Sequence, residues 1–346
     1  MLAGCSMTGA KAALLGVEDL VVSYAVRSGS LWRRPTELVA VDGVSLTVRH
    51  GEVLALVGES GCGKTSLART VSGLVAPRAG RVRLDGQDVT GFPASLGSGT
   101  RAAVQMVFQD PYDSLNPRKT VFATLEQPLR IHSVVPARDI RAEIGRLLAL
   151  VGLPQSAMDR YPHEFSGGQR QRIGIARAIA PRPRLLVADE AVSALDISIR
   201  AQLLSLLARL QRDLGLAMLF ITHDLTVVRS FADRVAVMYL GRLVEEGPTA
   251  RVFDAPAHPY TRALLASTPI ADPARVRGAR REPLGGDVPS PLAVPPGCRF
   301  HPRCPAAIAR CSSDEPPRVD DPAGGFAVCH LAGGDPAFQS TGQGRR

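Results

Sequence analysis

Residues 58–65 read Gly-Glu-Ser-Gly-Cys-Gly-Lys-Thr, which matches the spacing G-x-x-x-x-G-K-S/T of a phosphate-binding loop. Glycines let backbone N–H groups turn inward around phosphates, and a helix that starts after the loop adds the positive end of its dipole. We expect Lys64 to reach the β- and γ-phosphates and the Thr65 hydroxyl to ligate Mg²⁺. The alternative is a chance glycine-rich turn, with Cys62 as a small filler. The apolar run 53–57 before the loop and the helical pattern after it favour the phosphate site.

Two adjacent carboxylates, Asp189 and Glu190, follow the apolar run 185–188. A pair of solvated carboxylates would more naturally follow a turn, so their position at the end of a buried strand favours a role in chemistry. Asp189 is suited to hold Mg²⁺ through its water shell, and Glu190 to polarise an attacking water. Together with the loop, these residues predict a site that binds and hydrolyses a nucleoside triphosphate.

A third motif narrows the class of protein. Residues 165–169, Phe-Ser-Gly-Gly-Gln, resemble the signature sequence of ABC ATPases, with Phe in the usual Leu place. Ser166 precedes Asp189 by 23 residues, a separation similar to that of the family. The resemblance implies that Ser166 and its glycines face the γ-phosphate of an opposing subunit. ATP is then expected between two such domains, and a monomer is expected to be inactive.

Other residues fit the same resemblance. Gln109 looks like the Q-loop glutamine, Asp196 ends a segment that resembles the D-loop, and His223 resembles the switch histidine. Tyr24 is the candidate for stacking on adenine, with ordinary packing as its alternative. Residues 191–192 are Ala-Val where the family more often has Pro-Thr, but both carboxylates remain, so we do not interpret the site as degenerate.

These patterns together give the predicted site. The predicted catalytic residues are Glu190, His223 and Gln109. The predicted ATP-binding residues are Tyr24, Gly58, Ser60, Gly61, Cys62, Gly63, Lys64, Thr65, Ser66, Gln109, Asp189 and His223. The predicted contacts to the partner's ATP are Ser166, Gly167, Gly168, Gln169 and Asp196. The predicted magnesium ligands are Thr65, Gln109 and Asp189.

Two further segments, 108–118 and 257–261, resemble the ATPases of oligopeptide, dipeptide and nickel importers. The resemblance runs from about residue 16 to residue 330. It implies an ATP-hydrolysing subunit that energises import of peptides, with nickel or another small solute as the alternative. It also implies two transmembrane permease subunits, a second identical or homologous ATPase subunit in a head-to-tail dimer, and an extracytoplasmic solute-binding protein. The expected location is peripheral, on the cytoplasmic face of the cell membrane.

Four cysteines lie near the C-terminus: Cys298, Cys304, Cys311 and Cys329. Residues 298–305 resemble the cysteine motif of the same importer ATPases, in which such cysteines can hold an iron–sulfur cluster. The resemblance therefore implies a 4Fe–4S cluster with a structural role. Structural zinc sites prefer closer cysteine pairs than these, and cytosolic disulfides are rare. Zinc and unligated thiols remain the alternatives.

The surrounding pattern predicts elements that would position these residues. Alternating residues at 14–23 and 38–48 predict antiparallel strands, and short apolar runs at 53–57, 185–188 and 218–221 predict buried strands. Helical periodicity dominates residues 111–180. The predicted fold is an α/β P-loop ABC ATPase domain: a RecA-like parallel sheet core, an antiparallel β-subdomain, a helical subdomain and a C-terminal cysteine-containing extension.

Composition suggests the domain limits. We predict a nucleotide-binding domain at 14–255, with its helical subdomain at about 110–180, and an extension at 256–335 that contains a linker rich in Pro, Gly and Asp at 271–296 and the cysteine motif. Residues 1–13 and 336–346 are expected to be disordered. Met1 and Met7 are both candidate starts, and the first residues resemble a lipoprotein box without the basic and apolar regions of a signal peptide.

The net charge of +9 does not indicate a nucleic-acid partner, because residues 270–346 hold ten Arg against eight acidic residues and form no basic tail. Nor does any run approach the roughly 18–20 apolar residues of a transmembrane helix. The rival function is a soluble ABC ATPase that acts on nucleic acid or ribosomes. Ser166 follows Thr65 by only 101 positions, too few for the long coiled coil of many such proteins. A third alternative, an inactive regulatory subunit, conflicts with the intact carboxylates.

Overall fold

The computed structural model describes residues 12–26, 36–93, 95–110, 114–193, 196–267 and 285–332. Of the residues predicted to be disordered, 1–13 and 336–346, only residues 12 and 13 lie inside these ranges, and Ala13 begins a strand. The choice between Met1 and Met7 and the first part of the predicted linker also lie outside them. Within them, no helix is both long enough and apolar enough to cross a membrane.

The main sheet has eight strands in the order β11-β12-β10-β9-β3-β8-β7-β6. The five strands from β9 to β6, which end at one edge of the sheet, are parallel. β3, β7 and β8 are buried at every position, as expected for parallel strands covered on both faces. The predicted strands at 53–57, 185–188 and 218–221 are confirmed. The strands are β3 (Val53–Val57), β6 (Val104–Val107), β7 (Leu185–Asp189), β8 (Ala217–Thr222), β9 (Arg234–Tyr239), β10 (Arg242–Pro248), β11 (Arg318–Asp320) and β12 (Phe326–Val328).

A smaller antiparallel sheet has the order β2-β1-β4-β5. β1 and β2 pair over most of their length, as the alternating pattern predicts. Their apolar side chains face the main sheet and helix α1, where they form one shared core. The strands of this sheet are β1 (Ala13–Val26), β2 (Thr36–Arg49), β4 (Ala79–Leu84) and β5 (Gln87–Asp88).

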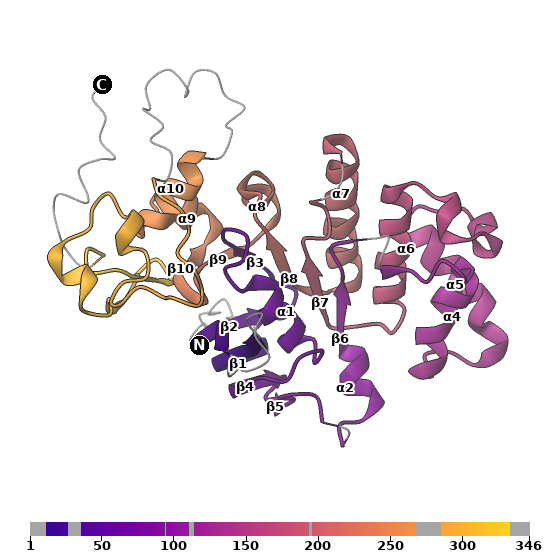
Figure 1. Ribbon diagram of the computed structural model, residues 1–346. Coiled ribbons are helices and arrows are strands. Elements are labelled where there is room, and N and C mark those ends of the chain that lie inside the picture. The colour runs from indigo at the N-terminus through magenta and orange to yellow at the C-terminus, as the bar shows by residue number, and fades with distance from the viewer. Residues whose placement is uncertain are drawn as a thin grey trace, which may run out of the picture.

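Helices cover the main sheet, and the group α4–α6 lies at the end opposite the C-terminal segment (Figure 1). The predicted helical character of the described part of residues 111–180 is confirmed, with three short 3-10 turns between the helices. The helices are α1 (Lys64–Val71), α2 (Ser98–Ala103), α4 (Val121–Ile131), α5 (Ile140–Leu150), α6 (Gly167–Ile179), α7 (Ile197–Leu214), α8 (Leu225–Phe231), α9 (Thr249–Asp254) and α10 (Pro259–Ser267).

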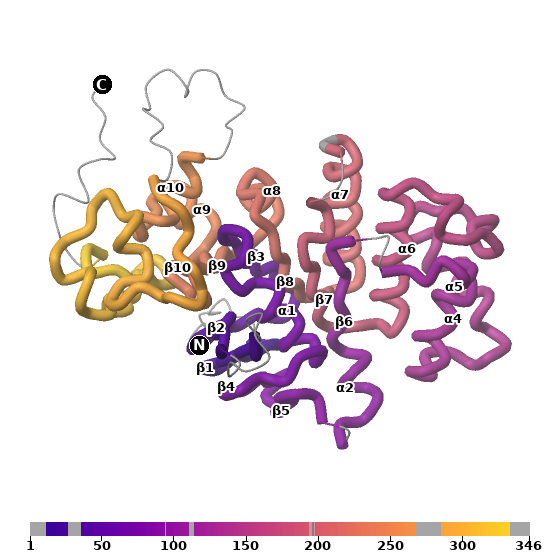
Figure 2. The backbone as a smooth tube through the Cα atoms, viewed as in Figure 1, coloured from indigo at the N-terminus to yellow at the C-terminus, as the bar shows by residue number. Residues whose placement is uncertain are grey.

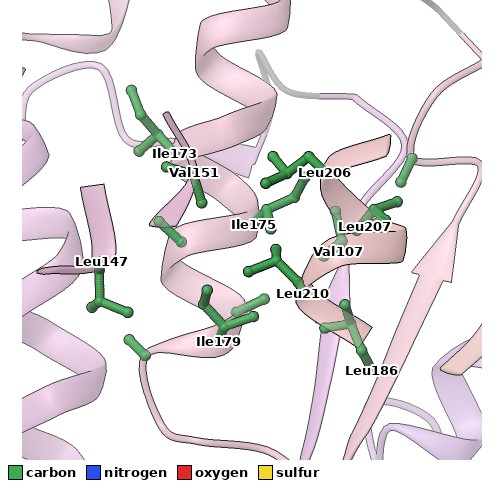
Figure 3. Packing of buried hydrophobic residues seen from close by; sticks show 14 of the residues in the cluster. Val107, Leu147, Val151, Ile173, Ile175, Ile179, Leu186, Leu206, Leu207 and Leu210 are labelled. Atoms are coloured by element: carbon green, nitrogen blue, oxygen red, sulfur yellow. The ribbon is translucent and has the colours of Figure 1, made fainter. Parts of the chain in front are cut away.

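Helix α6 connects this helical group to the sheet. Figure 3 shows Ile175 and Ile179 of α6 near Leu206 and Leu210 of α7, with Leu186 of β7 close by. All five side chains are buried in one apolar cluster. The helical group therefore shares a core with the sheet that carries Asp189 and Glu190, and it is not an isolated appendage.

The C-terminal segment returns to the main sheet. β11 and β12 form a hairpin, and β12 pairs with β10 through Glu245↔Ala327 and Glu246↔Phe326. Figure 2 shows this segment, at the yellow end of the colour scale, beside β10. The predicted α/β fold with its parallel and antiparallel sheets is confirmed, while the cysteine-containing extension and the division at residue 255 stay predictions.

Candidate active site

The phosphate loop connects β3 to α1 and requires glycine where it passes close to other backbone. A Cβ atom on Gly63 would lie 2.1 Å from the carbonyl oxygen of Ala40, and one on Gly58 would lie 2.2 Å from that of Met238. Both distances are far below van der Waals contact. Gly61 and Gly63 also have positive φ angles of 79° and 108°, which glycine adopts readily. The loop conformation therefore depends on glycines at these positions of the predicted motif.

Lys64 is the first residue of α1 and is 4% exposed. Its Nζ donates to the carbonyl oxygens of Gly58 and Glu59, at 2.8 and 2.9 Å, so the ammonium is held across the loop. The Cys62 thiol lies 3.7 Å from the same Nζ, and burial raises its pKa. Cys62 thus behaves as a buried filler, while the neighbouring Ser60 and Gly61 are exposed. An exposed loop above a fixed ammonium suits a phosphate group.

Two of the predicted magnesium ligands meet beside the loop. The Thr65 hydroxyl donates to Asp189 Oδ1 at 3.2 Å, although the residues are 124 positions apart. Burial raises the pKa of Asp189, and the adjacent Glu190 carboxylate adds to the rise. A bound divalent cation would offset both effects by stabilising the charged carboxylate. Asp189 and Thr65 therefore fit Mg²⁺.

Glu190 is the meeting point of the predicted catalytic residues. Its Oε2 accepts from Gln109 Nε2 at 3.0 Å, and its Oε1 lies 3.3 Å from His223 Nδ1. These three side chains come from the ends of β6, β7 and β8, which are neighbours in the sheet. The Glu190 side chain is 15% exposed and its backbone has φ 45°, in the left-handed region that costs free energy for a residue with a Cβ atom. The glutamate is thus held against a local backbone preference.

The signature residues lie apart from the loop of the same chain. Ser166 caps α6 in a capping box with Gln169: Gln169 N donates to Ser166 Oγ at 3.4 Å, and Ser166 N to Gln169 Oε1 at 3.1 Å. Gly168 is buried, and a Cβ atom there would lie 2.6 Å from Ile199. Gly167 begins the helix. In Figure 1, β7 and β6 lie between α1 and α6. A single chain therefore does not bring the signature residues to its own phosphate loop.

The remaining predicted residues lie at the edges of the site. Asp196 precedes α7 as its exposed N-cap residue. Ser66 follows Thr65 in α1 and is half-buried. Tyr24 lies near the end of β1 opposite Leu38, half-buried against the core of the antiparallel sheet. These positions are compatible with the predicted roles and do not test them.

Comparison with known proteins decides the family. The family described as "ABC transporter" matches residues 41–193, and "Oligopeptide/dipeptide transporter, C-terminal region" matches residues 244–311. A probable peptide ABC transporter ATP-binding protein of Sinorhizobium fredii is 49% identical, over 92% of this chain and 90% of that protein. The chain belongs to the family of ATP-binding proteins of peptide ABC transporters. It is an ABC ATPase.

Other relatives and solved structures agree. The oligopeptide transport ATP-binding protein AppF of Bacillus subtilis is 46% identical over 92% of this chain and 97% of its own. The structure of cbiO1 from Clostridium perfringens, part of an ABC transporter complex, is similar with a TM-score of 0.60 and 27% identity, over 70% of this chain and 91% of its own. A dimeric post-hydrolysis ATP-binding cassette bound to ADP and phosphate gives a TM-score of 0.58 at 26% identity, over 68% and 98% of the two chains.

The four C-terminal cysteines of this ABC ATPase are brought near one another. Cys298, Cys311 and Cys329 are buried, Cys304 is partly exposed, and none forms a disulfide. Burial raises the pKa of Cys304 to about 11, with the other three thiols contributing. Among the described residues, however, no three His, Cys, Asp or Glu side chains are arranged to hold a metal ion. The described residues therefore give no support to the predicted 4Fe–4S cluster, which stays a prediction.

Sequence reasoning missed two residues that contact the phosphate loop. The Tyr260 hydroxyl accepts the N–H of Glu59 at 2.9 Å, and Arg303 forms an ion pair with the Glu59 side chain. Tyr260 lies inside the segment that indicates the importer subfamily, and Arg303 lies inside the cysteine motif. The two motifs therefore include the two residues, but neither motif predicts a contact with the phosphate loop.

Proposed function

We propose that this ABC ATPase energises the import of peptides through a membrane transporter. The observation that carries the proposal is the joint presence of an assembled hydrolysis site around Glu190 and a C-terminal match to oligopeptide/dipeptide transporters. The relatives named as oligopeptide and dipeptide transport ATP-binding proteins support the same role.

The site residues have distinct proposed roles in hydrolysis. Lys64 and the loop N–H groups bind the β- and γ-phosphates, and Tyr24 stacks on adenine. Thr65 and Asp189, with Gln109, would hold Mg²⁺, whose charge would stabilise the transferred phosphoryl group. Glu190 accepts a proton from the attacking water, and His223 orients Glu190 and contacts the γ-phosphate.

The complete site is proposed to form between two ATPase subunits. Ser166, Gly167, Gly168, Gln169 and Asp196 would contact ATP held by the partner subunit. Support comes from the exposed position of Ser166 away from its own loop and from the dimeric state of the similar cassette. The partner is an identical or homologous ATPase subunit.

A groove beside the site supports the proposed membrane partners. It runs from Thr65 and Asp189 past Gln109 to the exposed Ile131 at the end of α4. This groove is the proposed seat of a permease segment, which would link hydrolysis to transport. Two permease subunits and an extracytoplasmic solute-binding protein complete the proposed complex. The ATPase then lies on the cytoplasmic face of the membrane.

Reconstitution tests the proposed function. The subunits that co-purify from detergent-solubilised membranes are placed in proteoliposomes with the solute-binding protein, and uptake of a labelled oligopeptide is measured. We expect ATP-dependent uptake that is lost in a Lys64→Ala complex, because the substitution removes the ammonium that binds the phosphates. Uptake of nickel or another solute in place of peptide would contradict the peptide assignment.

The 4Fe–4S cluster is a separate proposal, supported by the cysteine motif alone. Anaerobic purification should give a brown protein with absorbance near about 400 nm, as iron–sulfur clusters do. A colourless protein that contains zinc or no metal would contradict the cluster. No step of ATP hydrolysis depends on it.

A further inference from the structure

Glu59, the second residue of the phosphate loop, is held from two sides by the C-terminal part of the chain. Arg303 donates from Nη1 and Nη2 to the two Glu59 carboxylate oxygens, at 2.7 and 3.0 Å. The Tyr260 hydroxyl accepts the Glu59 N–H at 2.9 Å. Residues 201 and 244 positions away thus fix both the main chain and the side chain of one loop residue.

The ion pair is well placed to fix geometry. The Arg303 side chain is 5% exposed and the Glu59 side chain 23% exposed, so water competes little for the guanidinium. Two parallel N–H···O bonds from a planar guanidinium define the orientation of the carboxylate as well as its distance. An exposed, singly bonded ion pair would not do this.

The contacts of Glu59 continue to Lys64, the lysine that is proposed to bind the phosphates. The carbonyl oxygen of Glu59 accepts from Lys64 Nζ at 2.9 Å. A shift of Glu59 would therefore move one of the two carbonyl groups that orient the ammonium. Arg303 is connected to Lys64 through a single residue.

The other end of the link is rigid. Arg303 ends a short 3-10 turn directly before Cys304, and its Nη1 lies 3.5 Å from the Tyr239 hydroxyl. The rings of Tyr239, Tyr260 and Phe300 pack with centroids 4.6 to 5.3 Å apart. The guanidinium thus projects from a buried aromatic cluster that fixes its position relative to the sheet.

We propose that Arg303 is a positioning residue for ATP binding and hydrolysis. It holds Glu59 so that the loop and Lys64 keep the arrangement that receives the nucleotide phosphates. The inference rests on the proposed ATP site and extends it, because it gives the C-terminal module a direct effect on nucleotide affinity. We define this module as residues 298–330.

The test compares two ion pairs that connect the module to the rest of the chain. Arg303→Gln removes the link to the loop. Asp321→Asn is the matched control, because Asp321, 26% exposed, forms an ion pair at 2.5 Å with the partly buried Arg251, and neither residue contacts Glu59. In the full chain, we expect Arg303→Gln to weaken MgATP affinity by about 5- to 150-fold, the usual range of coupling between linked sites. Asp321→Asn should change MgATP affinity less than about twofold. Its change in melting temperature should be similar to that of Arg303→Gln.

A conservative variant and a double-mutant cycle distinguish a positioning role of Arg303 from a general effect on the stability of the fold. Arg303→Lys should recover part of the affinity, since lysine keeps the charge but not the paired donors. Glu59→Gln and the double variant Glu59→Gln/Arg303→Gln complete a cycle, in which the double variant should bind ATP no more weakly than the weaker single variant. In the assembled transporter, the KM for ATP should rise more than kcat falls.

Two results would overturn the proposal: additive losses in the cycle, or equal ATP affinity in Arg303→Gln and Asp321→Asn. Failure of the ATP site itself would look different. In that case, the unaltered chain would not bind MgATP, or Lys64→Ala would bind it as tightly as the unaltered chain.

Discussion

At the residue scale, Glu190 combines a strained backbone with two side-chain partners, Gln109 and His223. A general base contributes about 10²- to 10⁴-fold to a rate. We therefore expect Glu190→Gln to lower ATP turnover by at least about 100-fold while ATP still binds, because glutamine keeps the shape but cannot accept the proton. Phosphate release and equilibrium ATP binding measure the two effects. Unchanged turnover would exclude Glu190 as the base.

The same scale shows what local patterns can predict. Lys64, Asp189 and His223 were predictable because each lies at a fixed distance from the end of a strand, where parallel strands bring side chains to one edge. The contact between Glu59 and Arg303 was not predictable, because it joins residues 244 positions apart and no local pattern specifies the partner of a charged side chain.

At the element scale, the start of α10 buries a histidine that should make folding depend on pH. His258 is 1% exposed, its ring Nδ1 accepts from the Tyr260 N–H, and its main-chain N–H donates to the side chain of the buried Glu245. Burial lowers the pKa of His258 to about 3, well below the ordinary value of 6.5. The unfolded chain therefore takes up a proton below about pH 6.5 that the folded chain does not, so stability is full above that pH and falls as the pH drops toward 3.

The expected loss attributable to His258 is about 1.4 kcal/mol of unfolding free energy between pH 7.5 and pH 5.5. The variant His258→Asn isolates this loss, because the amide oxygen can still accept from Tyr260 N but does not titrate in this range. Denaturant unfolding of both proteins at the two pH values gives the difference. An equal pH dependence in the two proteins would show that folding does not lower the pKa of His258.

Prediction at this scale was uneven, for a physical reason. Continuous apolar runs identified β3, β7 and β8, which are buried on both faces. β12 is only three residues long and is defined by its pairing with β10. A strand that depends on a partner 80 residues away has no periodicity of its own to detect.

At the scale of the whole molecule, hydrolysis is expected to require two subunits, and Ser166 offers a clean test. Ser166 is exposed and caps α6. Aspartate caps a helix as well as serine does, but its charge would repel the γ-phosphate of the partner's ATP. We expect Ser166→Asp to keep the fold and ATP binding of each subunit while preventing ATP-driven dimerisation, as measured by sedimentation in the presence of MgATP.

The control for this substitution is Ser166→Asn, which also caps the helix and carries no charge. It should dimerise with ATP more strongly than Ser166→Asp, and high salt should reduce the difference between them. Equal dimerisation of the two variants would show that Ser166 does not face the partner's nucleotide.

The pairing of β10 with β12 also bears on what happens when the chain is shortened. A chain that stops before β11 would leave backbone donors and acceptors of β10 open along one side, next to the buried Glu245 and Glu246. Such an open strand recruits strands from other molecules. Cleavage near residue 267 should therefore yield aggregates rather than a smaller working ATPase. The β11–β12 hairpin would then protect β10 from pairing with strands of other molecules.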